Sequence, residues 1–211
     1  MVGSSLTWLV IGAIPFLLPL LFQTVFGWSP IKSGALVLFV FVGNIAIKPA
    51  TSFLYRTYGF RRVLLAATIC LSLTAIGCAL LTASTPVVAI ALLTLISGAA
   101  RSVSMTGYTT LALSDVPLPQ MRPANALFST AQQLFTGLAV ALATVALRIG
   151  HLLGHALGST DGLRAAYSVA FLAVAIVAAI ATAVALRLDR SAGEILTNAD
   201  ATSRSPTATP G

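Results

Sequence analysis

Six apolar stretches dominate this chain, and each is long enough to cross a lipid bilayer as a helix, which needs about 20 residues. They run from Leu6 to Phe26, Ser33 to Tyr55, Val63 to Ala83, Pro86 to Leu113, Pro123 to Ile149 and Arg164 to Leu188. With 57% hydrophobic and 8% charged residues, the composition excludes a water-soluble globular domain. The sequence therefore predicts an all-α integral membrane protein, with six transmembrane helices in residues 1–188.

The composition changes after the last stretch. Residues 189–211 are rich in Ser, Thr, Ala and Pro without apolar periodicity, which predicts a disordered cytoplasmic tail. The longest predicted loop, residues 150–163, carries His151 and His155 four residues apart, with Asp161 nearby. Such a set can ligate a metal in principle, but we interpret the histidines as ordinary surface residues. We expect neither a metal site nor a cofactor.

Positive charges predict the orientation in the membrane. Ten of the twelve Lys and Arg residues lie in loops, in the tail or at the ends of the stretches, seven on one side and three on the other. The two groups are Arg56, Arg61, Arg62, Arg122, Arg187, Arg190 and Arg204 against Lys32, Arg148 and Arg164. Because cytoplasmic loops carry the excess of Lys and Arg, we expect both termini in the cytoplasm and the protein in the inner (plasma) membrane. The scattered basic residues argue against nucleic-acid binding, despite a net charge of +7.

The two charged residues that lie well inside the stretches, away from their ends, are cations. They are Lys48 and Arg101, whereas the acids Asp115, Asp161, Asp189, Glu194 and Asp200 all lie in loops or the tail. A charge at the bilayer centre costs about 2.5 to 3.5 kcal/mol, so Arg101 must face protein or water. We interpret these cations as functional, with bonding of carbonyls or helix ends as the structural alternative. Pro49 leaves the carbonyl of Ile45 without its helical partner, which should loosen the helix there.

Three stripes of polar residues follow helical spacing. They are Asn44, Lys48, Ser52 and Tyr55; Ser97, Arg101, Ser104 and Tyr108; and Asn125, Ser129, Gln132 or Gln133, and Thr136. Such stripes predict either a polar cavity or polar helix–helix interfaces. Our candidates for a substrate cavity are Asn44, Lys48, Arg101, Met105, Tyr108, Gln132 and Gln133.

Small residues within the stretches favour close approach of helices. We expect this packing role for Gly98, Gly107 and Gly137.

The segments PFLLPLLFQTVFGWSPIKSGAL, GFRRVLL and ARSVSMTGYTTLALSDVPLPQMRPANALFSTAQQLFTGLAVAL occur in this order, within about residues 8–187. Together they resemble the C-terminal half of a major facilitator superfamily transporter, of the fourteen-helix drug:proton antiporter group that includes multidrug exporters. The resemblance implies one six-helix half-bundle of the major facilitator fold, with substrate held where two halves meet. It also implies export of small amphipathic compounds by proton antiport in a complete transporter. The implied partners are the lipid bilayer, protons and the missing N-terminal half, which carries the proton site in that family.

Residues 56–62 resemble a cytoplasmic loop motif of the same superfamily, whose charges latch the two halves together in one state. Gly59, Arg61 and Arg62 match the end of its Gly, Asp-Arg, Gly, Arg-Arg pattern, but Arg56 occupies the position where Asp is expected. The usual ion pair within the loop is therefore not expected. The arginines remain available for acidic groups on a partner half or for anionic lipid.

Two other interpretations stay open. The chain could be a six-helix membrane protein that homodimerises with a second copy, or a non-transporting remnant of a truncated gene. An enzyme is not expected, because the sequence has no HExxH, no nucleophile-elbow pattern and no intramembrane acid to act as a base.

Overall fold

The computed structural model describes residues 2–113, 116–156 and 162–186, and the predicted tail, residues 189–211, lies outside them. The described residues form seven α-helices and one short 3-10 helix, and they include no strand. The helices are α1 (Val2–Thr24), α2 (Pro30–Ala46), α3 (Lys48–Tyr58), α4 (Phe60–Ala79), α5 (Val87–Leu113), η1 (Leu118–Gln120), α6 (Met121–Ala156) and α7 (Gly162–Leu186). The predicted all-α class is confirmed.

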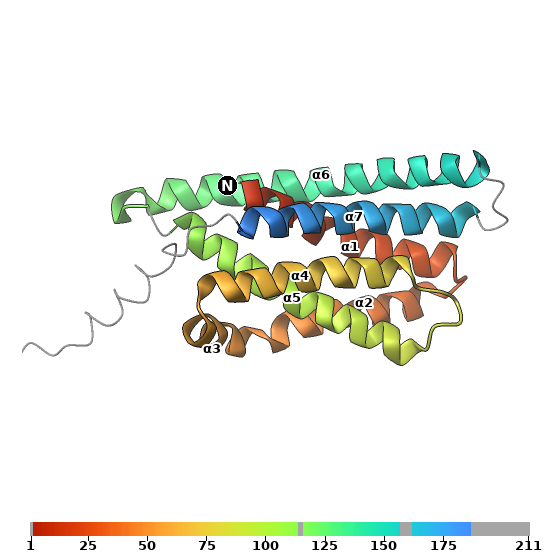
Figure 1. Cartoon of the computed structure of the whole chain (residues 1–211), viewed down its shortest axis with the longest axis horizontal. Helices are drawn as coiled ribbons and strands as arrows, with labels where there is room; N and C mark the ends of the chain where they lie inside the picture. Colours follow the sequence, from red (N-terminus) through yellow and green to blue (C-terminus); the bar gives the residue numbers. More distant parts are fainter. Residues whose placement is uncertain (1, 114–115, 157–161, 187–211) are drawn as a thin grey trace, which may run out of the picture.

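Five of the described helices are long and apolar enough to cross a membrane, and α2 with α3 adds a sixth span if the bent pair counts as one. The helices run along the long axis of the bundle (Figure 1). The N-terminus, the turn from α3 to α4 and the start of α6 lie at one end of it. The six predicted stretches therefore correspond to these spans.

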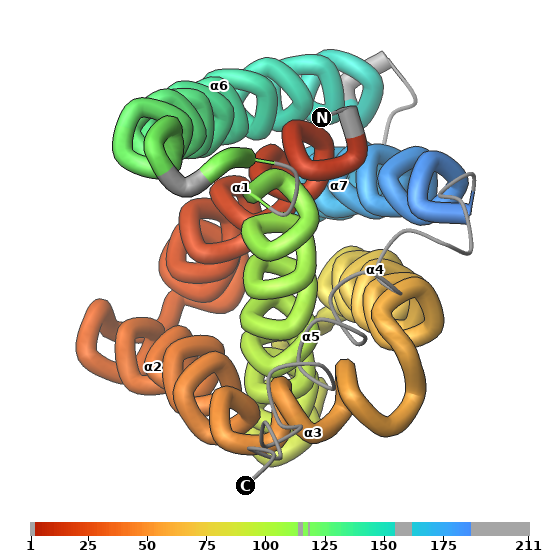
Figure 2. Tube along the Cα trace, turned by 90° about the vertical axis from the view of Figure 1, so that its left-hand side faces the viewer, coloured from red at the N-terminus to blue at the C-terminus, as the bar shows by residue number. Residues whose placement is uncertain are grey.

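Helix α1 packs against α6 and α7, and α5 packs against α2 and α4. Contacts of α4 with α7 join the two groups, as the view along the bundle shows (Figure 2). The core lies between them and contains fully buried side chains such as Leu17, Leu18, Phe22 and Phe171. On α1, the buried positions recur every three or four residues, which is the period of one helical face.

The second predicted span is broken at Ile47, where the axes of α2 and α3 differ by 50°. Pro49 has no N–H for the carbonyl of Ile45, and a proline ring crowds that carbonyl. The chain instead restarts its hydrogen bonding from the Ile47 carbonyl, which accepts from the N–H groups of Ala50 and Thr51. The predicted loosening at Pro49 is confirmed.

The same break overturns one prediction about polar residues. Asn44 lies on α2, whereas Lys48, Ser52 and Tyr55 lie on α3, beyond the bend. The expected single face of four polar side chains is therefore wrong, because residue spacing defines a face only while the helix stays continuous.

Helix α6 is longer than predicted, since residues 150–156 of the expected loop continue it. Gly150 allows α6 to pass directly over α7, because a Cβ at this position would lie 2.7 Å from the Cα of Ala166. His151 and His155 consequently lie on a helix. Asp161 is outside the described residues.

Two glycines bring the backbones of α2 and α5 into contact. A Cβ on Gly98 would overlap the carbonyl oxygen of Val40, and a Cβ on Gly43 would overlap the carbonyl oxygen of Leu95. The contact is reciprocal, since each helix presents a glycine to the backbone of the other. The prediction for Gly98 is confirmed, and sequence reasoning missed Gly43.

Gly107 and Gly137, the other two glycines for which we expected a packing role, have different surroundings. Gly107 of α5 lies against the ring of Tyr55 and the side chain of Leu64, so its predicted packing role is confirmed. Within the described half-bundle, the prediction for Gly137 is wrong, because a Cβ there would meet no atom of the described residues within 4 Å.

Arg61 joins the start of α4 to the end of α7. Its Nη2 donates a hydrogen bond of 2.6 Å to the carbonyl oxygen of Leu186, one of the last-turn carbonyls that lack a partner within their own helix. The cation also meets the negative end of the α7 dipole. Gly59, with φ of +79°, supplies the left-handed turn from which α4 and Arg61 begin.

We expect Gly98→Ala to destabilise the bundle and Gly137→Ala to leave it intact. The added methyl group at position 98 forces α2 and α5 apart, and overpacking of this kind costs about 1 to 3 kcal/mol. At position 137 the methyl group enters open space and improves helix propensity. Thermal unfolding in detergent, followed by circular dichroism, measures both variants. Equal melting temperatures would contradict the α2–α5 contact.

We expect Arg61→Ala to loosen the last turn of α7. Losing a cation at a helix C-terminus costs about 1 kcal/mol, which corresponds to about fivefold faster opening of the last turn. Hydrogen exchange of the amides in residues 182–186 reports this change. Arg62→Ala, which alters an exposed neighbour, is the matched control; the same acceleration in both variants would argue against the Arg61 contact.

Candidate functional site

Helix α5 carries the most polar buried face of the described bundle. Ser97, Ser104 and Tyr108 are only 2%, 0% and 5% exposed, and Arg101 is half-buried among them. Tyr108 contacts α1, because a Cβ on Gly3 would lie 3.3 Å from the Tyr108 Oη. Residues at these spacings share one side of a helix, so this face of α5 is turned toward α1.

Arg101 has polar atoms that the described residues do not satisfy. Its Nε and Nη1 are buried and have no hydrogen-bond partner in the described part of the chain. None of the described residues is an Asp or Glu, so no carboxylate there can pair with the guanidinium. The hydroxyl groups of Ser102 and Ser104 are likewise buried without a partner.

Buried polar groups are normally hydrogen-bonded, and an ionisable group inside a membrane usually marks a functional site. A guanidinium presents several N–H donors in a fixed planar arrangement that suits carboxylate and phosphate oxygens. The neighbourhood of Arg101 on α5 is therefore suited chemically to an anion or a strong hydrogen-bond acceptor that comes from outside the described residues.

The other candidate residues lie in several places. Met105 is half-buried one turn along α5 from Arg101, and Asn44 is half-buried on α2. Lys48 is exposed at the start of α3, so the structure does not bring the two intramembrane cations to one buried site. Gln132 is half-buried on α6, whereas Gln133 is exposed.

Helix α6 approaches α1 near the amide side chains. A Cβ on Gly12 would lie 2.9 Å from the carbonyl oxygen of Thr136, and Gln132 is one turn earlier on the same side of α6. Gln132 and Tyr108 thus approach α1 from two different helices. The structure places α1 between the polar faces of α5 and α6.

The four residues of the loop motif have different surroundings. Arg56 and Arg62 are exposed, Gly59 makes the turn into α4, and Arg61 binds the end of α7. One nitrogen of Arg61 is thus used within this half-bundle, a role that its place in the motif did not predict.

Some buried hydroxyl groups were not predicted as part of the site. Thr7 of α1 is 3% exposed and donates to the Gly3 carbonyl at 2.9 Å, beside the ring of Tyr108. Ser102 is buried on α5, away from the predicted stripe. These buried hydroxyl groups could have been found in the sequence from the density of hydroxyl side chains, six in the nine residues 102–110, and not from their periodicity.

Comparisons with known proteins agree with this architecture. The sequence profile of the Major Facilitator Superfamily matches residues 1–140. The multidrug resistance protein MdtD of Pectobacterium atrosepticum is 31% identical over 147 residues, which cover 70% of this chain and 32% of that protein. The MdtD proteins of Serratia proteamaculans and Yersinia enterocolitica are 28% and 25% identical, over 64% and 71% of this chain.

The chain spans about a third of the length of these curated relatives. The profile nevertheless covers more than half of the 211 residues, and the described helices fit a half-bundle of five straight spans and one bent span. The resemblance noted in the sequence is thereby confirmed, and the chain belongs to the Major Facilitator Superfamily.

Proposed function

We propose that this chain is one half of a secondary transporter that exports amphipathic, drug-like compounds, by proton antiport in the complete protein. The observation that carries the proposal is a half-bundle whose relatives are named for multidrug resistance. Its α5 holds the half-buried Arg101, two of whose nitrogens have no partner among the described residues. The described residues contain no carboxylate that could carry a proton. The family resemblance supports a proton site in the remainder of the transporter.

The proposed orientation puts the end with the α3–α4 turn in the cytoplasm of a bacterial inner membrane. Arg56, Arg61, Arg62 and Arg122 lie at or near this end, at the α3–α4 turn and the start of α6 (Figure 1). Lys32, Arg148 and Arg164 lie toward the opposite end. This distribution supports cytoplasmic termini by the positive-inside rule.

Binding of varied apolar compounds suits the side chains near Arg101 and α1. Met105 is flexible and polarisable, and Tyr108 and Gln132 add an aromatic ring and an amide for orientation. Arg101 would add selectivity in one of two ways: by binding the acidic group of an anionic substrate, or by pairing with a carboxylate from the rest of the transporter.

We expect Arg101→Gln, in a complete transporter that carries this half, to lower export of anionic amphipathic compounds about tenfold or more, since a hydrogen bond to a charged group contributes about 1.5 to 3 kcal/mol. Export of dyes of different charge from loaded cells measures the effect. Arg148→Gln, which removes an exposed cation of α6, is the matched control and should leave export unchanged.

The pattern across substrates separates the two roles of Arg101. A loss confined to anionic compounds supports direct binding of substrate, whereas an equal loss for anionic and cationic compounds supports an ion pair with the rest of the transporter. Unchanged export of every compound by Arg101→Gln and Arg101→Ala would contradict both roles.

A further inference from the structure

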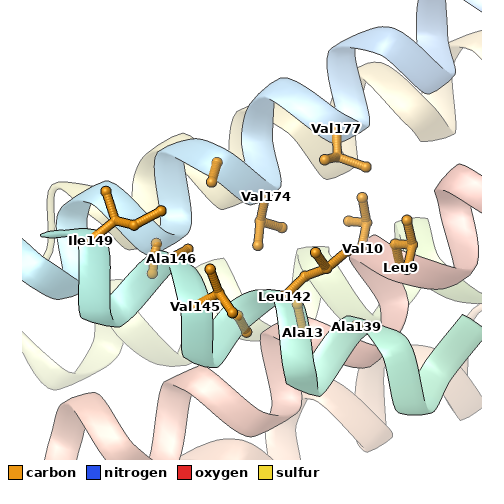
Figure 3. A pocket seen from close by; sticks show the side chains of 13 residues that line it. Leu9, Val10, Ala13, Ala139, Leu142, Val145, Ala146, Ile149, Val174 and Val177 are labelled. Atoms are coloured by element: carbon orange, nitrogen blue, oxygen red, sulfur yellow. The ribbon is translucent and has the colours of Figure 1, made fainter.

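A crevice between α1, α6 and α7 is lined only by aliphatic side chains. Its volume is about 260 Å³, and the side chains converge on it from all three helices (Figure 3). The lining residues are Leu9, Val10 and Ala13 of α1; Ala139, Leu142, Ala143, Val145, Ala146 and Ile149 of α6; and Ala170, Ala173, Val174 and Val177 of α7. No side chain of the site around Arg101 takes part in it.

Small side chains keep the crevice open. Six of the thirteen lining residues are alanines, which leave space where longer side chains would fill the gap between helices. Helix α6 touches α7 at Gly150 and touches α1 at Gly12. These two backbone contacts hold the three helices at a fixed separation, and the crevice lies in the stretch between them.

The length of the crevice along α6 and its apolar lining indicate what kind of molecule it can bind. Its lining on α6 runs from Ala139 to Ile149, a rise of about 15 Å, or about half of the roughly 30 Å hydrocarbon core. A polar ligand or ordered water would find no hydrogen-bond partner among these side chains. Since an apolar cavity of about 150 Å³ holds a benzene molecule, the volume here suits a segment of roughly ten carbons.

The crevice opens on the outer surface of the described half-bundle and not toward the polar face of α5. Its rim residues Leu142, Val145 and Ile149 are 47%, 53% and 49% exposed, and they continue into exposed Leu172 and Ile176 of α7. Helices α2 and α5 lie on the other side of α1 (Figure 2). We propose that this crevice binds one acyl chain of a membrane phospholipid near the middle of the bilayer, because its lining residues on α7 lie at the middle of that helix.

Photolabelling tests the proposal directly. The full chain is reconstituted in phosphatidylcholine nanodiscs that contain a small fraction of phosphatidylcholine with a mid-chain diazirine, and adducts are mapped by mass spectrometry after illumination. We expect adducts on Ala143 or Val174, which line the crevice and are only 3% and 7% exposed. Adducts on exposed Ile176 without any on Ala143 or Val174 would overturn the proposal.

Two substitutions of equal size separate the crevice from the surrounding surface. Ala146→Phe fills the crevice and should reduce adducts on Val174 at least fivefold, whereas Ala141→Phe alters an exposed alanine outside the lining and should not change them. If Ala146→Phe fails to give a monodisperse protein, Ala173→Leu serves as the milder filling variant. Unchanged labelling of Val174 in a folded filling variant, or cross-links from the lining to a second copy of the chain, would contradict acyl-chain binding.

Discussion

The backbone contact between α2 and α5 at Gly43 and Gly98 fixes the position of α5, the helix that carries Arg101. Within a membrane, helices gain little from the hydrophobic effect and associate through close packing. The two glycines let each helix rest on a carbonyl of the other, which sets the position of α5. Arg101, one turn beyond Gly98, is held half-buried as a consequence, with its face of α5 turned toward α1.

The described helices contain cations but no carboxylate, and the cations are stabilised in different ways. Arg61 binds the carbonyl of Leu186 at the end of α7. The ammonium group of Lys32 lies 3.8 Å from the centre of the Trp28 ring, a cation–π contact. Two nitrogens of Arg101 have no such partner among the described residues. We therefore expect Arg101 to find its partner outside this half-bundle.

Sequence reasoning predicted the spans and the isolated position of Arg101, because lipid sets the length of a helix and penalises charge. It predicted the weak point at Pro49 because proline has no N–H to donate within the helix. It failed where the outcome depends on a neighbouring helix. Gly43 and Gly137 look alike in sequence, but only Gly43 meets another backbone. The prediction of one polar stripe through Asn44 and Lys48 was wrong because a 50° bend changes which residues share a face. The predicted loop after residue 149 instead continues α6, and Gly150 in this extension contacts α7.

We propose that the guanidinium of Arg101 is reached by water or a polar ligand, whereas Ile96, on another side of α5, faces lipid. Single cysteine substitutions test this assignment in a chain whose Cys70 and Cys78 are replaced by alanine. Methanethiosulfonate reagents modify the thiolate form of cysteine, and this form is present only in a polar environment. In liposomes, a negatively charged reagent should modify Arg101→Cys and leave Ile96→Cys, at a 45% exposed position on the same helix, unmodified. An unreactive Arg101→Cys beside a reactive Ile96→Cys would contradict the assignment of the two faces.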